Sequence, residues 1–200
     1  MCIRDRLWTR PPAPVASTID GLMIRECGPA DAAAIAAVIN DAAEAYRDVI
    51  PADRWHDPYM PAADLAAELA AGVGFWAVEE PDRLVAVMGL QHVEDVALIR
   101  HAYTRPAYQG RGLGTLLLEH LRGLTELPLL VGTWAAASWA VRFYERCGFR
   151  MVGPEQKAEL LRRYWTIPER QIETSVVLAD SRWLAGRPGD QAASDRTADR

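Results

Sequence analysis

The hydrophobic positions of the chain follow two periods in turn, and this alternation predicts an ordered series of strands and helices. Short runs in which apolar residues alternate or continue, bounded by turn residues such as Pro81 and Asp82, are typical of strands. The predicted strands are residues 22–26, 75–79, 84–91, 96–104, 129–133, 149–152 and 172–178.

Helical periodicity separates most of these strands. Gly28 and Pro29 open a first helix, as expected for a helix start. Further helices are predicted at about 61–71, from 113, at about 137–146 and at 154–164. Buried stripes at the helical period are expected in the first helix (Ile35, Val38, Ile39, Ala42, Tyr46) and in the helix from 113 (Leu113, Leu116, Leu117, His120, Leu121, Leu124).

The two ends of the chain follow neither period. Residues 1–20 mix prolines with charges, and residues 181–200 mix Gly and Pro with a polar end, so we expect both to be disordered. The first six residues resemble adapter read-through in environmental sequence assemblies. Residues 1–20 are therefore either a native N-terminal segment or a non-native one. Residues 21–180 are predicted to form one domain, because 200 residues that are 50% hydrophobic suffice for a single core.

Composition excludes several classes of function. The net charge of −5 is spread without a basic stripe, so no nucleic-acid partner is expected. No apolar run approaches the roughly 18 residues of a membrane span and no apolar signal core follows the start, so we expect a cytoplasmic protein without a membrane partner. The cysteines and histidines do not cluster at ligand spacing, so neither disulfides nor a metal site is expected.

A glycine-rich segment, Gln-Gly-Arg-Gly-Leu-Gly at residues 109–114, lies where a predicted strand ends and a predicted helix begins. Alternate glycines leave the backbone bare, and the first turn of a helix offers unpaired N–H groups with a partial positive charge. These features predict a cradle for a diphosphate. A dinucleotide fingerprint would need glycine where Thr115 stands, and a Walker loop would need Gly-Lys followed by Ser or Thr, which the chain lacks.

Two motifs together indicate a family. Gln109, Gly112 and Gly114 resemble the Gln/Arg-x-x-Gly-x-Gly/Ala signature of the GNAT superfamily of acyl-CoA-dependent N-acyltransferases. Residues 142–149, Arg-Phe-Tyr-Glu-Arg-Cys-Gly-Phe, resemble the family's Phe/Leu-Tyr-x-x-x-Gly-Phe element. The resemblance implies an α/β (α+β) fold, in which helices flank a mixed, mostly antiparallel sheet of six to seven strands that splays between strands 4 and 5.

The resemblance also implies acetyl-CoA as co-substrate, with no metal. Members often carry an Asn near the start of the fourth helix; Ala137 occupies that place here, and Ser138 is the expected substitute. The main chain before the loop would pair with the pantetheine arm like an added strand and direct one N–H at the thioester oxygen. The residues implied for the arm are Ala102, Tyr103 and Thr104, and those for the pyrophosphate are Gln109, Gly110, Arg111, Gly112, Leu113 and Gly114.

Two side chains are candidates for proton transfer. The resemblance implies that Tyr144 protonates the leaving thiolate. The alternative is that Tyr144 is only a packed residue of the core. For the base that deprotonates the amine we consider His101, because imidazole titrates near neutral pH, with a packed core histidine as the alternative. Strict alternation puts Arg100 with Ala102, on the opposite strand face from His101, and a β-bulge would reverse that parity.

The acceptor side is expected from the segment after the first helix and from the insert before the last strand. Arg100 on the cleft face would favour an acceptor that bears a carboxylate or phosphate. Aromatic residues of the two segments form a binding wall in one interpretation and ordinary packing in the other. These residues are Tyr46, Trp55, His56, Tyr59, Tyr164 and Trp165.

The sequence therefore predicts an N-acetyltransferase that moves an acetyl group from acetyl-CoA to a primary amine by direct attack in a ternary complex. Cys147 has no histidine near it in sequence, so no nucleophilic role is expected for it. A non-catalytic acyl-CoA sensor or interaction module on the same fold is the alternative, and a nucleotide-binding domain of another fold is a third reading. The acceptor is a small-molecule or peptide amine, and a homodimer is suggested only by its frequency among relatives.

Overall fold

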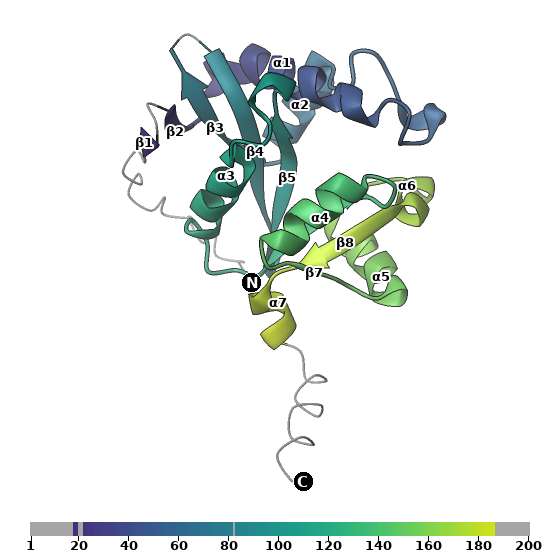
Figure 1. The fold of residues 1–200 in the computed structure, drawn as a ribbon. Coiled ribbons are helices and arrows are strands. Elements are labelled where there is room, and N and C mark those ends of the chain that lie inside the picture. The colour runs from purple at the N-terminus through teal and green to yellow at the C-terminus, as the bar shows by residue number, and fades with distance from the viewer. Residues whose placement is uncertain (1–17, 20–21, 82, 187–200) are drawn as a thin grey trace, which may run out of the picture.

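The computed structural model describes residues 18–19, 22–81 and 83–186. Within them an eight-stranded sheet has the order β1-β2-β3-β4-β5-β6-β8-β7 (Figure 1). All neighbouring strands are antiparallel except β5 and β6, which are parallel. The strands are β1 (Thr18–Ile19), β2 (Leu22–Glu26), β3 (Gly74–Glu80), β4 (Arg83–Val93), β5 (Val96–Thr104), β6 (Leu129–Trp134), β7 (Arg150–Met151) and β8 (Ser175–Ala179).

Helices cover both faces of the sheet (Figure 1). The α-helices are α1 (Ala32–Ala43), α2 (Ala62–Ala70), α3 (Leu113–Arg122), α4 (Ser138–Arg146), α5 (Pro154–Tyr164), α6 (Glu169–Thr174) and α7 (Ser181–Ala185). Short 3₁₀ turns are η1 (Pro29–Asp31), η2 (Glu44–Tyr46), η3 (Ala52–Arg54) and η4 (Pro106–Tyr108).

Alternation along the parallel strands separates two hydrophobic layers. Ala97 and Ile99 of β5 pack on the side of α3 and α4, where Leu117 and Leu121 are fully buried. Leu98 faces the opposite side, under α5. On that same side of the outer strands, α1 and α2 cover Phe75, Ala77 and Val87. Burial of a continuous apolar face on each side is what holds helices and sheet together.

The sheet splits between its two parallel strands. The β5–β6 ladder covers only Ala97 with Leu129, Leu98 with Leu130 and Ile99 with Val131. Beyond Ile99 the two strands diverge, β5 staying with β4 and β6 with β8. The predicted mixed sheet with a splay between its two parallel strands is therefore confirmed. Its count of eight strands exceeds the six to seven predicted because β1 adds a two-residue strand.

Several local predictions are wrong. Residues 172–174 belong to α6 and not to the last strand, which begins at Ser175. Tyr46 lies in the 3₁₀ turn η2, and Leu118, left out of the predicted stripe of α3, is fully buried.

Disorder at the two ends is also wrong in part, since Thr18–Ile19 pair with β2 and Ser181–Ala185 form α7. Asp180 caps α7 by accepting a hydrogen bond from the Trp183 N–H at 3.0 Å. The rest of the predicted disordered ends, residues 1–17, 20 and 187–200, lies outside the described residues.

Candidate active site

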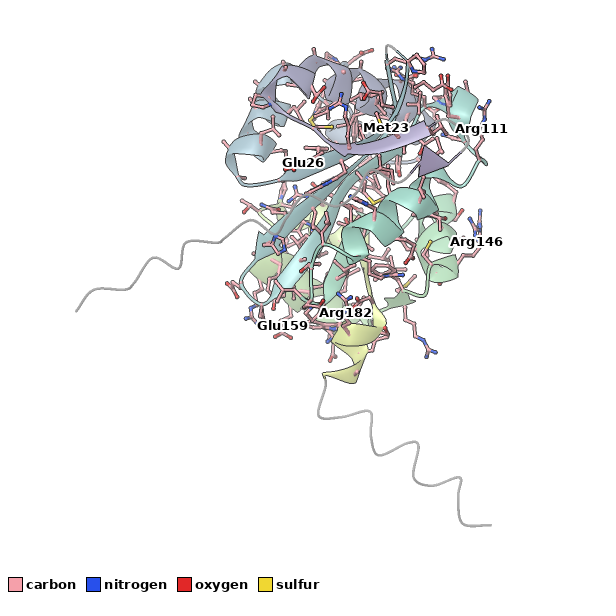
Figure 2. All side chains as sticks on the ribbon, turned by 90° about the vertical axis from the view of Figure 1, so that its left-hand side faces the viewer. Met23, Glu26, Arg111, Arg146, Glu159 and Arg182 are labelled. Carbon is pink, nitrogen blue, oxygen red and sulfur yellow. The ribbon has the colours of Figure 1, made fainter. Side chains whose placement is uncertain are left out.

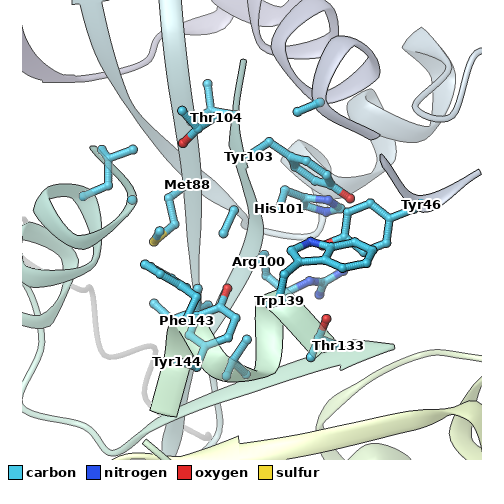
Figure 3. Close-up of a pocket in the computed structure, with 18 of the residues that line it drawn as sticks. Tyr46, Met88, Arg100, His101, Tyr103, Thr104, Thr133, Trp139, Phe143 and Tyr144 are labelled. Carbon is cyan, nitrogen blue, oxygen red and sulfur yellow. The ribbon is translucent and has the colours of Figure 1, made fainter. Parts of the chain in front are cut away.

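A cavity of about 550 Å³ occupies the split between β5 and β6. Its lining comes from elements distant in sequence: the ends of β5 and β6, the start of α3, one side of α4, η2 after α1, and the connection between α5 and α6. Figure 3 shows the side chains that meet there. Because the strands diverge, side chains and unpaired main-chain groups face a space that a regular sheet would close.

The loop before α3 presents free donors to this cavity. Gly110 and Gly112 have φ values of +76° and +80°, which favour glycine. Among the described residues, the backbone N–H groups of residues 110–115 donate to no acceptor. Gly114 is needed for packing, because an added Cβ would stand 3.2 Å from Cζ of Phe143 on α4. The segment therefore fits a ligand that brings a diphosphate.

Two arginines flank this cradle. Arg111 is exposed and lies over the ring of Tyr108, with Cζ 4.9 Å from the ring centroid, and it does not line the cavity. Arg146 lines the cavity from the C-terminal end of α4. Figure 2 shows both side chains projecting from the same side of the molecule. This side is positively charged where the loop donors are exposed.

The last residues of β5 supply main-chain groups to the split. Ala102, Tyr103 and Thr104 line the cavity, and they have no partner in β6. The Thr104 carbonyl accepts a hydrogen bond from Nε2 of Gln109 at 3.2 Å, which ties the strand end to the glycine loop. An extended chain segment would find a strand edge here, as in β-strand addition.

Tyr144 lines the cavity from α4. Its ring packs against Phe143 and Phe149, with centroid distances of 4.9 Å and 5.8 Å. Its hydroxyl points into the split, toward the space between Met88 and β6 (Figure 3). Burial, with Tyr46 and Cys147 nearby, raises the pKa of Tyr144 well above its ordinary value. The phenol therefore stays protonated and can serve as a proton donor at neutral pH.

A β-bulge sets the directions of Arg100 and His101. Val87 pairs with Tyr103 and Gly89 with Arg100, so Met88 alone stands opposite two residues of β5. His101 accommodates the extra residue with a φ of +47°. The face assignment from strict alternation is therefore wrong: the neighbours Arg100 and His101 both reach toward α2.

Glu68 of α2 is the shared partner of these two residues. Arg100 Nη2 lies 2.8 Å from both carboxylate oxygens of Glu68, and His101 Nε2 lies 3.3 Å from Oε2. Burial raises the pKa of Glu68, but the contacts with His101 and Arg100 outweigh burial and leave that pKa below its ordinary value. His101 also stacks on Phe75, with a centroid distance of 5.8 Å, and lines the cavity.

An aromatic wall closes the far side of the cavity. We use this name for Tyr46, Tyr59, Tyr103 and Trp139, all of which line it. The ring of Tyr46 lies 5.2 Å from that of Trp139 and 6.1 Å from that of Tyr103. Burial raises the pKa of Tyr46 to about 12, although interactions with Trp139 and Thr133 oppose the shift. Trp139 remains 38% exposed, so the wall reaches the mouth of the cavity.

Comparison with known families agrees with this geometry. Residues 71–151, from the end of α2 to β7, match the family described as acetyltransferase (GNAT) domain. Over these residues the chain is similar to GNAT acetyltransferase domains. No curated protein matches the chain in sequence.

Solved structures share the GNAT fold at low sequence identity. A GNAT-family acetyltransferase from Staphylococcus aureus is 14% identical, with a TM-score of 0.59 over 80% of this chain and 98% of that one. The PaiA N-acetyltransferase of Thermoplasma acidophilum, solved in complex with coenzyme A, is 16% identical, with a TM-score of 0.58 and coverages of 80% and 98%. The ribosomal-protein-S18-alanine N-acetyltransferase of Escherichia coli is 20% identical, with a TM-score of 0.55 and coverages of 80% and 92%.

The cavity gathers most of the sequence-derived candidates. Tyr144, His101, Tyr46 and Arg100 line it, as do residues 102–104 and the loop residues 109, 110 and 112–114. The described lining does not include Arg111, Ser138, Trp55 or His56. Ser138 is exposed at the start of α4. Trp55 packs on Tyr59, with a distance of 5.3 Å between ring centroids. His56 stacks on the Tyr59 ring, with a centroid distance of 6.4 Å.

Sequence reasoning missed other residues of the cavity. Glu68 belongs to no motif and reads as a solvated helix position, so nothing in the sequence marks it. Trp139 directly follows Ser138, and Arg146 lies inside the second motif, so both are neighbours of candidate residues in the sequence. Of the two aromatic candidates in the insert, Trp165 lines the cavity, whereas the Tyr164 hydroxyl donates to Asp95 at 2.7 Å.

Two further features of the described residues concern metal binding and membrane insertion. Among the described residues, no group of three or more His, Cys, Asp or Glu side chains is arranged to hold a metal ion. In the same part of the chain, none of the helices has the length and apolar character that a membrane span requires.

Proposed function

We propose that the protein is an N-acetyltransferase that transfers an acetyl group from acetyl-CoA to a primary amine within a ternary complex. The observation that carries the proposal is the continuity of three features in one cavity. These are the free N–H groups of residues 110–115, the unpaired end of β5 and the inward hydroxyl of Tyr144. Together they fit a diphosphate, an extended arm and a leaving thiolate in that order.

Binding of acetyl-CoA would use main chain more than side chains. The loop N–H groups would meet the pyrophosphate, and Arg146 at the cavity edge and Arg111 beside Tyr108 would add charge. The main-chain groups of Ala102, Tyr103 and Thr104 would pair with the amide-bearing arm. Main-chain N–H groups at the bulge around His101 are the candidates for stabilising negative charge on the thioester oxygen.

Transfer then needs one bond formed, one bond broken and two protons moved. The amine nitrogen attacks the thioester carbonyl, the tetrahedral intermediate collapses, and the carbon–sulfur bond breaks. Tyr144 protonates the departing thiolate, and its raised pKa keeps it in the donor form. His101 takes a proton from the amine, directly or through water, with Glu68 holding the ring. No covalent enzyme intermediate is required.

Release of free thiol from acetyl-CoA with a panel of primary amines tests the proposal, together with the mass gain of one acetyl group on the acceptor. We expect amine-dependent thiol release that stops when the amine is blocked. Tight binding of CoA without turnover on any amine would instead favour the acyl-CoA sensor or interaction module.

Location and assembly belong to the same proposal. We infer a cytoplasmic enzyme, because the reaction needs acetyl-CoA and the described residues include no membrane-spanning helix. A homodimer is the assembly we propose on the resemblance alone, and size-exclusion chromatography with light scattering tests it.

A further inference from the structure

The acceptor half of the cavity lacks negative charge. Its described lining contains no Asp or Glu side chain. The charged or titratable side chains that do line the cavity, apart from the tyrosines, are Arg100, His101 and Arg146. Arg146 belongs to the α4 end beside the glycine loop, because the adjacent Cys147 lies 3.9 Å from Thr115 near the start of α3. Only Arg100 and His101 therefore remain to set the charge near an acceptor.

Arg100 is not available to bind an acceptor carboxylate. Its side chain is 18% exposed and forms a two-oxygen contact with Glu68 at 2.8 Å. Its Nη1 donates to Oε1 of Gln91 at 2.6 Å. Glu68 thus neutralises the guanidinium and occupies the geometry that a substrate carboxylate would use. This finding removes the reason for expecting an acidic acceptor.

The remaining lining of the acceptor half is uncharged and rich in rings, with Thr133, Gln171 and Ser175 among its polar side chains. The aromatic wall presents Tyr46, Tyr103 and Trp139, and Trp134 and Trp165 add two further indoles that are 91% buried. Trp165 packs over Gly132 of β6, where an added Cβ would stand 3.4 Å from Cε2 of the indole. Ring faces and edges offer contact area and offset or edge-on stacking to an aromatic ligand.

From this arrangement we infer that the acceptor is a primary amine on an uncharged apolar body, aromatic by preference. The inference rests on the proposed acetyltransferase activity and specifies its substrate class. The reacting amine must lose its proton to attack, so it does not need a carboxylate partner. A second ammonium group would stay charged and lose its hydration without a counterion, and a carboxylate would meet no free cation.

Matched pairs of amines test the inference by kcat/KM for thiol release from acetyl-CoA. 2-Phenylethylamine differs from phenylalanine by a carboxylate, and pentylamine differs from 1,5-diaminopentane by a second amine. We expect the uncharged member of each pair to be favoured by about tenfold or more, and 2-phenylethylamine to exceed pentylamine. Preference for phenylalanine or the diamine would overturn the inference while leaving the acetyltransferase activity in place. Absence of thiol release with every amine would overturn that activity, and this inference with it.

A charge placed on the wall tests the same inference within the protein. Trp139→Glu introduces a carboxylate at the cavity mouth, at a position 38% exposed, and should shift the kcat/KM ratio toward 1,5-diaminopentane by about tenfold. Trp139→Gln removes the ring without adding charge and should lower kcat/KM for 2-phenylethylamine without that shift. Met151→Glu, at a 48% exposed position on β7 outside the cavity, is the matched control and should leave the ratio unchanged. An unchanged ratio in Trp139→Glu would contradict the inference.

Discussion

Oε2 of Glu68 lies 3.3 Å from Nε2 of His101, a contact that joins the last turn of α2 to the bulge of β5. The same carboxylate holds Arg100 through both of its oxygens. One half-buried acid thus contacts two consecutive side chains that a regular strand would point to opposite faces. The contact leaves the charge of Arg100 satisfied and gives His101 a defined orientation beside the cavity.

Loss of the Glu68 carboxylate should destabilise the protein in a pH-dependent way. Glu68→Gln leaves the buried guanidinium of Arg100 without its counterion, which we expect to cost about 2–3 kcal/mol near pH 7. The folded-state pKa of Glu68 is lowered, so its contribution to stability is fully present above the unfolded value and is lost as pH falls through the folded value. Thermal unfolding of both proteins, compared at neutral and at acid pH, measures the difference.

The difference in Tm between wild type and Glu68→Gln should therefore narrow below the ordinary Glu pKa of 4.5. Glu155→Gln, in the exposed first turn of α5, is the control for removing a carboxylate without a buried partner. A difference in Tm that stayed constant with pH would show that the ion pair is not its source.

Tyr144→Phe should lower kcat about a hundredfold, because the thiolate then leaves without a proton donor. Affinity for CoA should change little, since the ring and its packing against Phe143 and Phe149 remain. Steady-state kinetics and calorimetric titration with CoA separate the two effects. Wild-type turnover in Tyr144→Phe would remove the residue from this role.

His101→Ala tests the base. If His101 accepts the proton of the amine, the wild-type kcat/KM declines in acid as the imidazole becomes protonated, and this acidic limb should disappear in the variant. His101→Gln keeps more of the side-chain volume beside Phe75 and separates lost chemistry from lost packing. An acidic limb at the same position in all three proteins would leave His101 as a packed residue.

Gly112→Ala should weaken CoA binding by about tenfold and destabilise the protein by about 1 kcal/mol. The φ of +80° is unfavourable for alanine, although the added Cβ meets no atom within 4 Å, so the effect is on the backbone that presents the donors. Gly153→Ala, at a φ of −63° and equally open, is the matched control. Equal CoA affinity in the two variants would argue against the loop as the phosphate cradle.

The local pattern of hydrophobic and polar residues predicts much of the scaffold. The predicted ranges 96–104 and 154–164 coincide with β5 and α5, because each run shows one period and ends at turn or cap residues. The glycine loop is recognisable because alternate glycines at a helix start leave a local signature. Tyr144 was found because it belongs to a motif.

The sequence pattern does not predict several short elements, because nonlocal contacts stabilise them. The apolar run at 172–178 fits a strand, yet Ile172 is buried under α5 as part of α6, and periodicity over so few residues does not distinguish the two. The five-residue α7 depends on partners far away in sequence: Arg182 Nη1 donates to the Thr125 carbonyl at 2.6 Å. An isolated helix of that length has no stability of its own.

The sequence by itself determined the order of the longer elements, the loop that precedes α3 and the tyrosine of the second motif, because each depends on residues that are neighbours along the chain. Tertiary structure decided which side chains meet. The bulge at His101 turns Arg100 toward α2, where Glu68 satisfies its charge, and η2 brings Tyr46 to Trp139 of α4. Such encounters depend on how strands diverge and helices pack over long sequence separations, and no local period encodes them.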